Sequence, residues 1–423
     1  MRSEVLLFIL LLPALGCAQI LSGDSIADPV LPADRHLPMG IRSAGMGGAG
    51  VAIAEDYSSL FYNPANLAYI SRFEAAGALQ FDILNYKGTL DGDASSEGSD
   101  NYIKLQSVGG VIPVPTSRGG LVFGIGFART NTFDRRIRFK GVGDDGLIYD
   151  GDESVKGGLG KFCIGGGIQV SPYAALGMSL DFYAGGERYS WYYDRVNPGG
   201  TDWPDTVERK TILDDIRDEY SGIGARFGTL IVPNRFVQIG AYISTPTLIN
   251  IDEEGVLRFD SLTTGWEVYQ EDYDYIESIE LTLPWRFGAG LAIRPTDWLV
   301  FAGDAEYVDW RQIEYDEPAW MLYQNRLMDD DFRPTLRWSA GGEVTIPVAA
   351  IRLRGGFSQE PIPYQVQGGD RVRNTISGGA GFILGDLVSL DMATQFSNWN
   401  ADGERLDEEY RLARIWLGLS YRF

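Results

Sequence analysis

The stretch Ile279–Ile293 reads IELTLPWRFGAGLAI, and its side chains alternate strictly in character. Every odd-numbered residue is apolar or aromatic, whereas the even-numbered residues are charged, small or hydroxylated, apart from Pro284. A period of two places successive side chains on opposite faces of a β-strand. The alternation keeps its phase through Pro284, so we expect one long strand over residues 276–295. Because Pro284 has no amide hydrogen, it would mark a local break or bulge in that strand.

The same alternation recurs along the chain from residue 72 onward. It predicts fourteen strands near residues 72–88, 102–114, 118–133, 158–171, 174–191, 218–232, 235–250, 276–295, 298–312, 335–347, 349–359, 372–384, 387–397 and 411–423. After residue 20 no stretch approaches the roughly 18 apolar residues of a membrane-spanning helix. If the chain enters a membrane, it must therefore cross with strands.

The connections between the expected strands alternate in length. After the even-numbered strands they are tight, namely Pro115-Thr116-Ser117, Pro172-Tyr173, Pro233-Asn234, Thr296-Asp297, Val348 and Gly385-Asp386. After the odd-numbered strands they are much longer. Outer-membrane barrels have this asymmetry, whereas a soluble β-sandwich gives no reason for it. We therefore predict an all-β fold, a fourteen-stranded antiparallel transmembrane β-barrel, closed so that every strand edge is paired.

In such a barrel the apolar odd positions would face lipid and the opposite face would line the lumen. A charge on the lipid face near the midplane costs about 2–4 kcal/mol, so the charged residues are expected inside a wet or salt-bridged lumen. They are Asp181, Arg226, Arg286, Asp304, Glu306, Arg337, Glu343, Arg352, Arg354, Asp391 and Arg414. The acidic stretch between strands seven and eight, around Asp252-Glu253-Glu254, is expected to be a solvated, cation-bridged loop facing lipopolysaccharide.

The N-terminus predicts export from the cell interior. Residues 1–18 read as a signal peptide, with an apolar core at Val5–Leu12 and the small residues Gly16-Cys17-Ala18 at the cleavage site. Lipidation of Cys17 is the alternative, although Ala14 stands where such signals have a large aliphatic residue. Residues 19–71 would then form a leader and a plug, and residues 72–423 the barrel.

Composition excludes several classes of function. A formal charge of −22 repels phosphate backbones, so we expect no nucleic-acid partner. The single histidine, His36, lies in a proline-rich leader, which excludes a His-based triad or zinc site. Cys163 is the only cysteine left after signal removal, so neither an intrachain disulfide nor a cysteine metal cluster can form. We expect no metal, no cofactor and no catalytic residues.

Residues 39–71 interrupt the period of two. They begin with a Gly/Ala-rich segment, continue through a possible helical turn at residues 55–61, and reach Asn63-Pro64-Ala65 before the first strand. Gly45–Gly50 also fits G-x-G-x-x-G, but a dinucleotide site needs a strand before it and a helix after it in a βαβ unit. No such alternation follows, so a nucleotide site is rejected.

This arrangement resembles the N-terminal hatch of the FadL-type outer-membrane channels for long-chain fatty acids and other hydrophobic molecules. The matching residues are Gly45–Gly50, Glu55-Asp56 and Asn63-Pro64-Ala65, with a weaker echo in Leu281–Trp285 and Asp304–Trp310. The resemblance covers the hatch best and the external loops hardly at all. It implies a hatch inside the lumen, with gating residues Asn63, Pro64, Ala65, Gly47 and Gly48.

Three further groups of residues are candidates for function. Gly124 and Gly126 would form the strand-three kink that opens a side door in FadL-type proteins, or else make room in the lumen for the hatch. Trp320, Tyr323 and Leu327 would form an external capture loop, or the inner face of a helix that caps the barrel. Tyr421 and the terminal Phe423 resemble the signal that barrel assembly machinery reads.

We thus expect a passive channel in the bacterial outer membrane, with long-chain fatty acids or other hydrophobic small molecules as its partners besides lipid, lipopolysaccharide and the assembly machinery. A PorV-like shuttle or scaffold of type IX secretion is the alternative, because such proteins also resemble this pattern. A barrel enzyme such as a lipid hydrolase is a further rival that no residue favours.

Overall fold

The computed structural model describes residues 37–53, 56–90, 94–198, 207–263, 268–319, 321–363, 365, 372–385, 387–402 and 406–423. The predicted signal peptide and the first part of the leader lie outside these ranges. Within them, no helix is long and apolar enough to cross a membrane.

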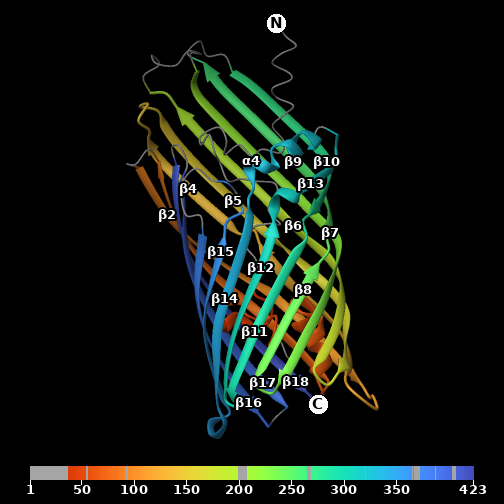
Figure 1. The fold of residues 1–423 in the computed structure, drawn as a ribbon. Coiled ribbons are helices and arrows are strands. Elements are labelled where there is room, and N and C mark those ends of the chain that lie inside the picture. The colour runs from red at the N-terminus through yellow and green to blue at the C-terminus, as the bar shows by residue number, and fades with distance from the viewer. Residues whose placement is uncertain are drawn as a thin grey trace.

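Eighteen strands form one antiparallel sheet that closes on itself (Figure 1). Four crossings consist of two strands each, β3/β4, β8/β9, β10/β11 and β12/β13, so the wall has the fourteen crossings that the sequence predicts. The strands are β1 (Glu74–Leu90), β2 (Ala94–Val114), β3 (Leu121–Thr132), β4 (Arg135–Val142), β5 (Ile148–Ser171), β6 (Ala174–Val196), β7 (Val207–Asn234), β8 (Val237–Ser244), β9 (Thr247–Thr263), β10 (Val268–Leu283), β11 (Arg286–Thr296), β12 (Leu299–Asp309), β13 (Glu314–Glu317), β14 (Pro334–Ile346), β15 (Ile351–Pro361), β16 (Val372–Leu384), β17 (Val388–Asp402) and β18 (Leu406–Arg422).

The short helices lie in the hatch and the connections. They are α2 (Ile41–Gly45), α3 (Ser59–Tyr62), η3 (Pro64–Tyr69), η4 (Trp310–Gln312), η5 (Met321–Arg326), α4 (Met328–Asp331) and η6 (Pro347–Ala349). The C-terminus and the short turns lie at one end of the barrel, and the tall hairpins of β5, β6, β7, β9 and β10 project at the other (Figure 1).

The barrel closes where the first strand meets the last. β1 pairs with β18 over the full length of both strands, from Glu74 opposite Arg422 to Leu90 opposite Leu406. The pairing continues into the chain end, where Phe73 and Phe423 exchange backbone hydrogen bonds of 3.1 and 3.0 Å. No edge of this seam is therefore left to pair with another chain.

An apolar belt surrounds the outside of the wall. Its exposed residues include Leu79, Ile103, Leu105, Phe123, Ile164, Leu176, Leu180, Phe182, Ile223, Phe227, Leu248, Leu291, Phe301, Leu336, Leu353, Phe382, Phe396 and Leu417. Exposed aromatic residues flank the belt, with Tyr173, Phe236, Trp298 and Tyr421 toward the short turns and Trp285, Tyr307 and Trp338 toward the long hairpins. Apolar bands between aromatic girdles are the surface that a barrel presents to lipid.

The upper edge of the belt is clearest on three neighbouring strands. Phe182, Ile223 and Leu248 are register partners on β6, β7 and β9, and all three are exposed. Farther up the same strands the outward residues are charged, as Arg188, Glu219 and Asp252 show. The long hairpins thus continue beyond the membrane into water.

Much of what was predicted as loop is therefore strand. The expected long connections after strands three, five and seven are largely occupied by extensions of β4 to β7 and by the β9–β10 hairpin. The acidic stretch between strands seven and eight lies in that hairpin, so the predicted loop is strand, although most of its acids are exposed to solvent as expected. Glu253 points inward and is 7% exposed, while its neighbours Asp252 and Glu254 face solvent.

The prediction of one strand through Pro284 is also wrong. β10 ends at Leu283 and β11 begins at Arg286, and the inward face changes parity between them. Below the break, Phe287 and Leu291 are exposed toward lipid, whereas Ile279 and Leu281 above it are 2% and 1% exposed. Within this crossing, the odd-numbered apolar residues therefore face lipid in β11 and the lumen in β10.

The reason for this inversion is the change of surroundings at the membrane surface. Within the membrane, apolar side chains belong outside; above it, they belong inside, away from water. The apolar residues stay at odd positions on both sides of Pro284. The strand therefore inverts at the break, so that its odd-numbered face points inward above Pro284 and outward below it. The other three interrupted crossings invert in the same way, including β8/β9, whose break at Thr245-Pro246 lies beside Pro284-Trp285.

Candidate functional site: the hatch and the lumen around it

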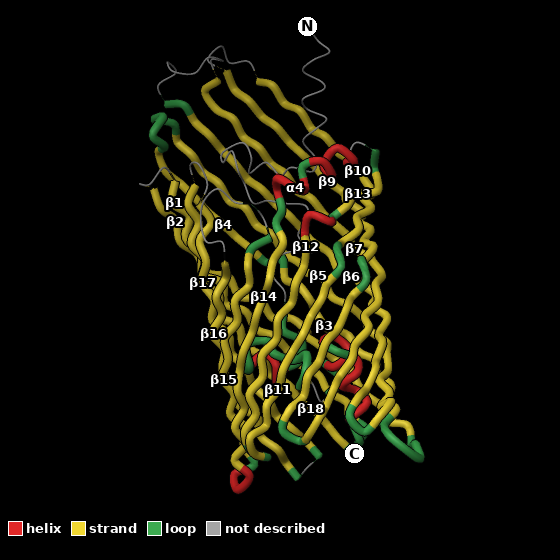
Figure 2. Tube along the Cα trace, in the orientation of Figure 1, coloured by secondary structure: helices red, strands yellow, loops and turns green. Residues whose placement is uncertain are grey.

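The hatch, which we define as the described residues 37–69, crosses the lower lumen from wall to wall. α2 contacts β15 to β18, whereas α3 and η3 contact β3, β5 and β6 on the other side. Figure 2 shows these helices enclosed by the strands, toward the end where the C-terminus lies. The predicted helical turn at residues 55–61 corresponds to α3, but Glu55 lies outside the described residues.

Inward-facing glycines on the wall make this packing possible. A Cβ added at any of them would collide with hatch atoms; they are Gly120, Gly167, Gly177, Gly228, Gly240, Gly341, Gly356 and Gly418. Gly228 lies against Asn63, Gly177 against Pro64 and Ala65, and Gly356 against Met46 and Gly47. The barrel interior is thus shaped to the hatch rather than merely wide enough for it.

Asn63-Pro64-Ala65 holds one end of the hatch against the wall. The Asn63 side chain is fully buried; its Nδ2 donates to the carbonyl oxygens of Thr229 on β7 (2.9 Å) and Val51 (3.0 Å), and its Oδ1 accepts from the Ala65 amide (3.1 Å). Asn63 therefore caps η3, while Pro64 occupies the first helical position, where its missing N–H matters least.

Gly47 and Gly48 lie at the centre of the hatch, where it passes β14 and β15. Their φ values are +74° and +94°, a conformation that side-chain-bearing residues rarely adopt. A Cβ at Gly47 would also collide with the backbone of Phe357. The Gly47 amide donates to Ser377 Oγ at 2.7 Å, which fixes the turn to β16.

An ion-pair network ties α2 to the neighbouring wall strands. The Arg42 guanidinium binds both carboxylate oxygens of Glu343 on β14, at 3.1 and 2.8 Å. Arg354 on β15 contacts Glu343 at 2.7 Å and Asp391 on β17 at 2.6 Å. Inward charges of both signs are therefore neutralised as pairs, which confirms the predicted salt-bridged lumen at these residues.

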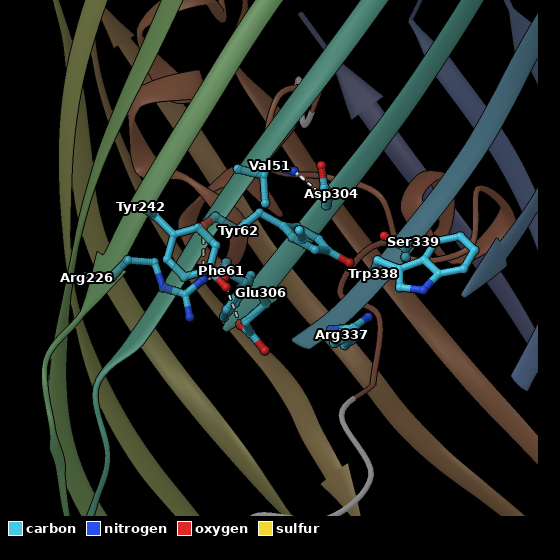
Figure 3. A pocket seen from close by; sticks show the side chains of 12 residues that line it. Val51, Phe61, Tyr62, Arg226, Tyr242, Asp304, Glu306, Arg337, Trp338 and Ser339 are labelled. Atoms are coloured by element: carbon cyan, nitrogen blue, oxygen red, sulfur yellow. Dashed lines mark hydrogen bonds between the residues drawn. The ribbon is translucent and has the colours of Figure 1, made fainter. Parts of the chain in front are cut away.

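A small hollow lies between α3 and the wall strands β7, β8, β12 and β14 (Figure 3). Arg226 lies over the Tyr242 ring at 4.4 Å and donates to the carbonyl oxygens of Phe61 and Tyr62, and Tyr242 hydrogen bonds to Glu306. The hollow measures about 20 Å³, which is room for one water. At this point a hydrophobic molecule cannot pass unless the hatch moves.

Asp304 fixes the hatch beside this hollow. One of its carboxylate oxygens accepts from the amides of Gly50 and Val51, at 2.5 and 2.8 Å (Figure 3). Because Asp304 belongs to β12 and the two amides follow Gly47-Gly48, this contact connects the central turn of the hatch to the wall.

The wall has a window at the height of the belt, between β2 and β3. The β2–β3 ladder ends at Ser107 opposite Ala128, although β2 continues upward with Leu105 and Ile103 exposed on the outside. Above that point β2 is paired to β1 only, and β3 and β4 to β5 only, within the part of the chain that the structure describes.

Side chains and the start of the hatch close the window. Lys104 binds Asp134 and donates to the carbonyl of Gly157 at 2.7 Å. The Gln106 side chain bridges the carbonyl oxygens of Arg129 and Pro38, each at 3.2 Å. The Leu37 amide donates to Thr130 at 2.7 Å, so the hatch supplies part of the closure.

The glycines expected to kink strand three do not lie at the window. Gly124 and Gly126 are within the regular β2–β3–β5 ladder, and a Cβ on them would contact Leu60 or Phe61 of the hatch at 3.2–3.4 Å. The interruption is at residues 133–134. Sequence reasoning missed Lys104, Gln106 and Asp134, because the change of inward parity between Ala128 and Ile137 leaves no mark in the sequence, whose apolar residues stay at odd positions.

The other predicted sites lie at the two ends of the barrel. Trp320 lies outside the described residues, and nothing is described of the Tyr323 side chain in η5. Leu327 is half-buried next to Met328, which belongs to the core of the upper lumen. Tyr421 and Phe423 are exposed at the seam, and the Phe423 ring lies 4.3 Å from that of Phe73.

Above the hatch, inward side chains form a large apolar cluster in the upper lumen. It contains Leu90, Phe133, Phe139, Tyr149, Leu159, Tyr189, Trp191, Tyr193, Tyr220, Ile249, Ile279, Leu281, Trp310, Tyr315 and Phe332 among others. Several rings are in contact: Trp191 stacks on Tyr193 at 5.9 Å, and Phe139 lies 6.0 Å from Trp191. This surface is suited to hydrophobic and aromatic molecules.

Comparisons with solved structures identify the same architecture. The chain superposes on a Pseudomonas aeruginosa FadL homologue with a TM-score of 0.65 and 14% identity, covering 92% of this chain and 99% of the other. The Ralstonia pickettii toluene transporter TbuX gives 0.63 at 16% identity, covering 91% and 98%. The P. putida toluene transporter TodX gives 0.64 at 14% identity, also covering 91% and 98%.

Neither a family model nor a curated protein matches the sequence. At these identities the likeness is one of fold. The chain therefore has the fourteen-stranded outer-membrane barrel fold that the FadL homologue and the two toluene transporters share.

Proposed function

We propose that this protein is a passive outer-membrane channel for hydrophobic small molecules. A solute would enter the apolar upper lumen from outside, because burial of each methylene is worth about 0.8 kcal/mol. Solved proteins of the same fold include a FadL homologue and toluene transporters, so fatty acids and monoaromatic hydrocarbons are the two solute classes to compare. The PorV-like scaffold role stays an untested prediction.

Exit is proposed to occur sideways through the window between β2 and β3. The observation that carries this route is the ladder's end at Ser107 and Ala128, at belt height, where contacts of Lys104, Gln106 and Leu37 replace the backbone ladder. A solute leaving there passes from the lumen into lipid without crossing water. Movement of the hatch near Pro38 would open the window, because Pro38 is one of its bridges.

The test is uptake by cells of a host that lacks its own channel of this kind. Expression of the chain should raise the uptake rate of radiolabelled toluene or oleate. Lys104→Met should raise it severalfold more, because it removes the Lys104–Asp134 link. Lys87→Met is the control for loss of a lysine ion pair, since Lys87 pairs with Glu409 at 3.5 Å on the outer face of the sheet, away from the window.

Two results would count against the proposal. Uptake of both solutes no faster than in the channel-free host would overturn the function. Equal rates for Lys104→Met and Lys87→Met would overturn the exit route only. Secreted proteins that copurify with the chain, without any uptake, would favour the scaffold role.

A further inference from the structure

The inner wall of the upper lumen carries a row of carboxylates at one height. Glu187 on β6, Asp218 on β7, Glu253 on β9 and Glu277 on β10 are successive register partners, and each has the inward parity of its strand. The row lies five residues, or about 16 Å of strand, above the top belt residues Phe182, Ile223 and Leu248. It is therefore outside the membrane but inside the barrel.

Apolar rows lie on both sides of this acidic row. On the hatch side the register partners are Tyr220, Ile251 and Ile279, and on the outer side they are Tyr189, Ile216 and Tyr275 with Gly255 between the last two. Glu187 and Glu253 are 6% and 7% exposed. A carboxylate between apolar rows loses hydration, and its carboxylate neighbours lie one strand spacing away.

Basic groups do not neutralise the two central acids of the row, Asp218 and Glu253. Burial, then the nearby Asp218, raises the pKa of Glu253 to about 8, and burial raises the pKa of Asp218 to about 6. Bases close to the Glu187 end of the row are paired with other acids: Lys104, which donates to the carbonyl of Gly157 opposite Glu187, binds Asp134, and Arg135 pairs with Glu153. A solute anion would thus meet acids rather than bases.

A second observation points to a ligand in the same part of the lumen, four residues or about 13 Å of strand beyond the row. Trp191 and Asp214 are cross-strand partners on the inner face, 3% and 8% exposed. Among the described residues, neither the Trp191 indole nitrogen nor Asp214 Oδ1 has a hydrogen-bond partner. A buried donor and a buried acceptor that both lack partners are costly, and one small polar group could satisfy both.

We propose that the upper lumen selects hydrophobic compounds by the charge of their polar group, accepting hydroxyl and amine groups and rejecting carboxylates. The aromatic rings would hold the hydrocarbon part, and rings with nearby acids also favour ammonium groups. A metal ion is not the expected occupant, since no group of three or more acids, histidines or cysteines in the described residues could hold one. This inference rests on the proposed function and narrows its solute class.

The experiment compares three ligands that share one skeleton: para-butylbenzylamine, para-butylbenzyl alcohol and para-butylbenzoate. Their binding to the purified full chain in neutral detergent is measured by isothermal titration calorimetry at about pH 9, where Glu253, Asp218 and the benzoate are all anionic. The benzoate should bind about tenfold or more weakly than the alcohol, because like charges placed together are costly.

Two isosteric variants locate the effect. Glu253→Gln and Asp218→Asn each remove one inward carboxylate. Each should reduce the gap, which is the ratio of the benzoate Kd to the alcohol Kd, severalfold. Glu254→Gln is the matched control, because Glu254 is the next residue on β9 and is exposed on the outside. It changes the net charge equally and should leave the gap unchanged.

The outcomes separate the two proposals. If none of the three ligands binds, the proposed channel function fails. If all three bind equally well, or if Glu254→Gln narrows the gap as much as Glu253→Gln, the charge selection is wrong and the channel function stands. A narrowed gap in Glu253→Gln or Asp218→Asn alone supports the selection.

Discussion

Replacing Asn63 by alanine should release the hatch from the wall while leaving the barrel intact. The fully buried side chain makes three hydrogen bonds, to Thr229, Val51 and Ala65. Val51 O keeps a partner, because Asn66 Nδ2 also donates to it at 3.2 Å. The Ala65 amide loses its acceptor, which costs about 1–3 kcal/mol, and the lost bond to the Thr229 carbonyl, which belongs to the β6–β7–β8 ladder, is worth about 0.5–1.5 kcal/mol.

The expected loss of hatch stability is therefore about 1.5–4.5 kcal/mol. At 1.4 kcal/mol per factor of ten, a loss of about 3 kcal/mol raises the population of the released hatch by roughly two orders of magnitude. Amide hydrogen exchange, read by mass spectrometry in detergent, should show this acceleration in residues 56–70. Exchange in β14 to β17 should stay slow, since their ladders do not involve Asn63.

Asn66→Ala serves as the graded control. Its Nδ2 contacts Val51 and Gly50 at 3.2 and 3.4 Å and reaches no barrel strand. It should accelerate hatch exchange much less. Hatch exchange in Asn63→Ala that matches the unaltered chain, or equal acceleration in the barrel strands, would refute the idea that this residue fastens the hatch.

Three further predictions follow from the same structure. Glu253 keeps its proton in the folded state until about pH 8 but loses it near pH 4.5 when unfolded, so its contribution to stability is complete below pH 4.5 and disappears as the pH rises through 8. The thermal unfolding temperature in detergent should fall across that window, and a fall of the same size in Glu253→Gln would contradict this account. Leu281→Ala should destabilise the chain by about 2–5 kcal/mol in a chemical denaturation series, because the residue lies in the upper core. Leu291→Ala should cost much less, since lipid or detergent fills the space on the outer face. Similar losses in the two variants would show that the assigned faces are wrong. Deleting Phe423 removes a ring contact and two backbone hydrogen bonds at the seam, so the heat-modifiable, folded fraction in outer membranes should drop, and an unchanged yield would argue against an assembly signal there.

The sequence predicts the wall well because alternation reports a boundary between two solvents. On β6 this boundary is visible in the sequence. The apolar residues fall at even positions from Leu176 to Phe182, and the aromatic residues Tyr189, Trp191 and Tyr193 fall at odd positions. The shift of phase marks where the strand leaves the membrane, with no break in the backbone. Reading that shift would have extended the strand and placed its upper half outside the lipid.

The same reasoning fails at Pro284, where the apolar residues stay at odd positions although the strand inverts. Alternation gives only which residues share a face; it does not say which face points inward. The window was missed for a related reason, since whether β2 and β3 stay paired depends on tertiary contacts of Lys104 and Gln106 with residues far along the chain. The hatch motif, in contrast, is local and was located correctly by its small residues.

The inverted crossings make the height of the lipid-facing apolar belt easy to change by substitution. In the crossings that invert at a proline, the position of the proline sets which side chains face lipid and which face the upper lumen. Moving Pro284 by two positions along an otherwise unchanged alternation would transfer one apolar residue from one environment to the other. Matched moves of Pro246 on the adjacent crossing would keep the two breaks level, so the hydrophobic thickness on this side could be altered by relocating two prolines, without rewriting the strands.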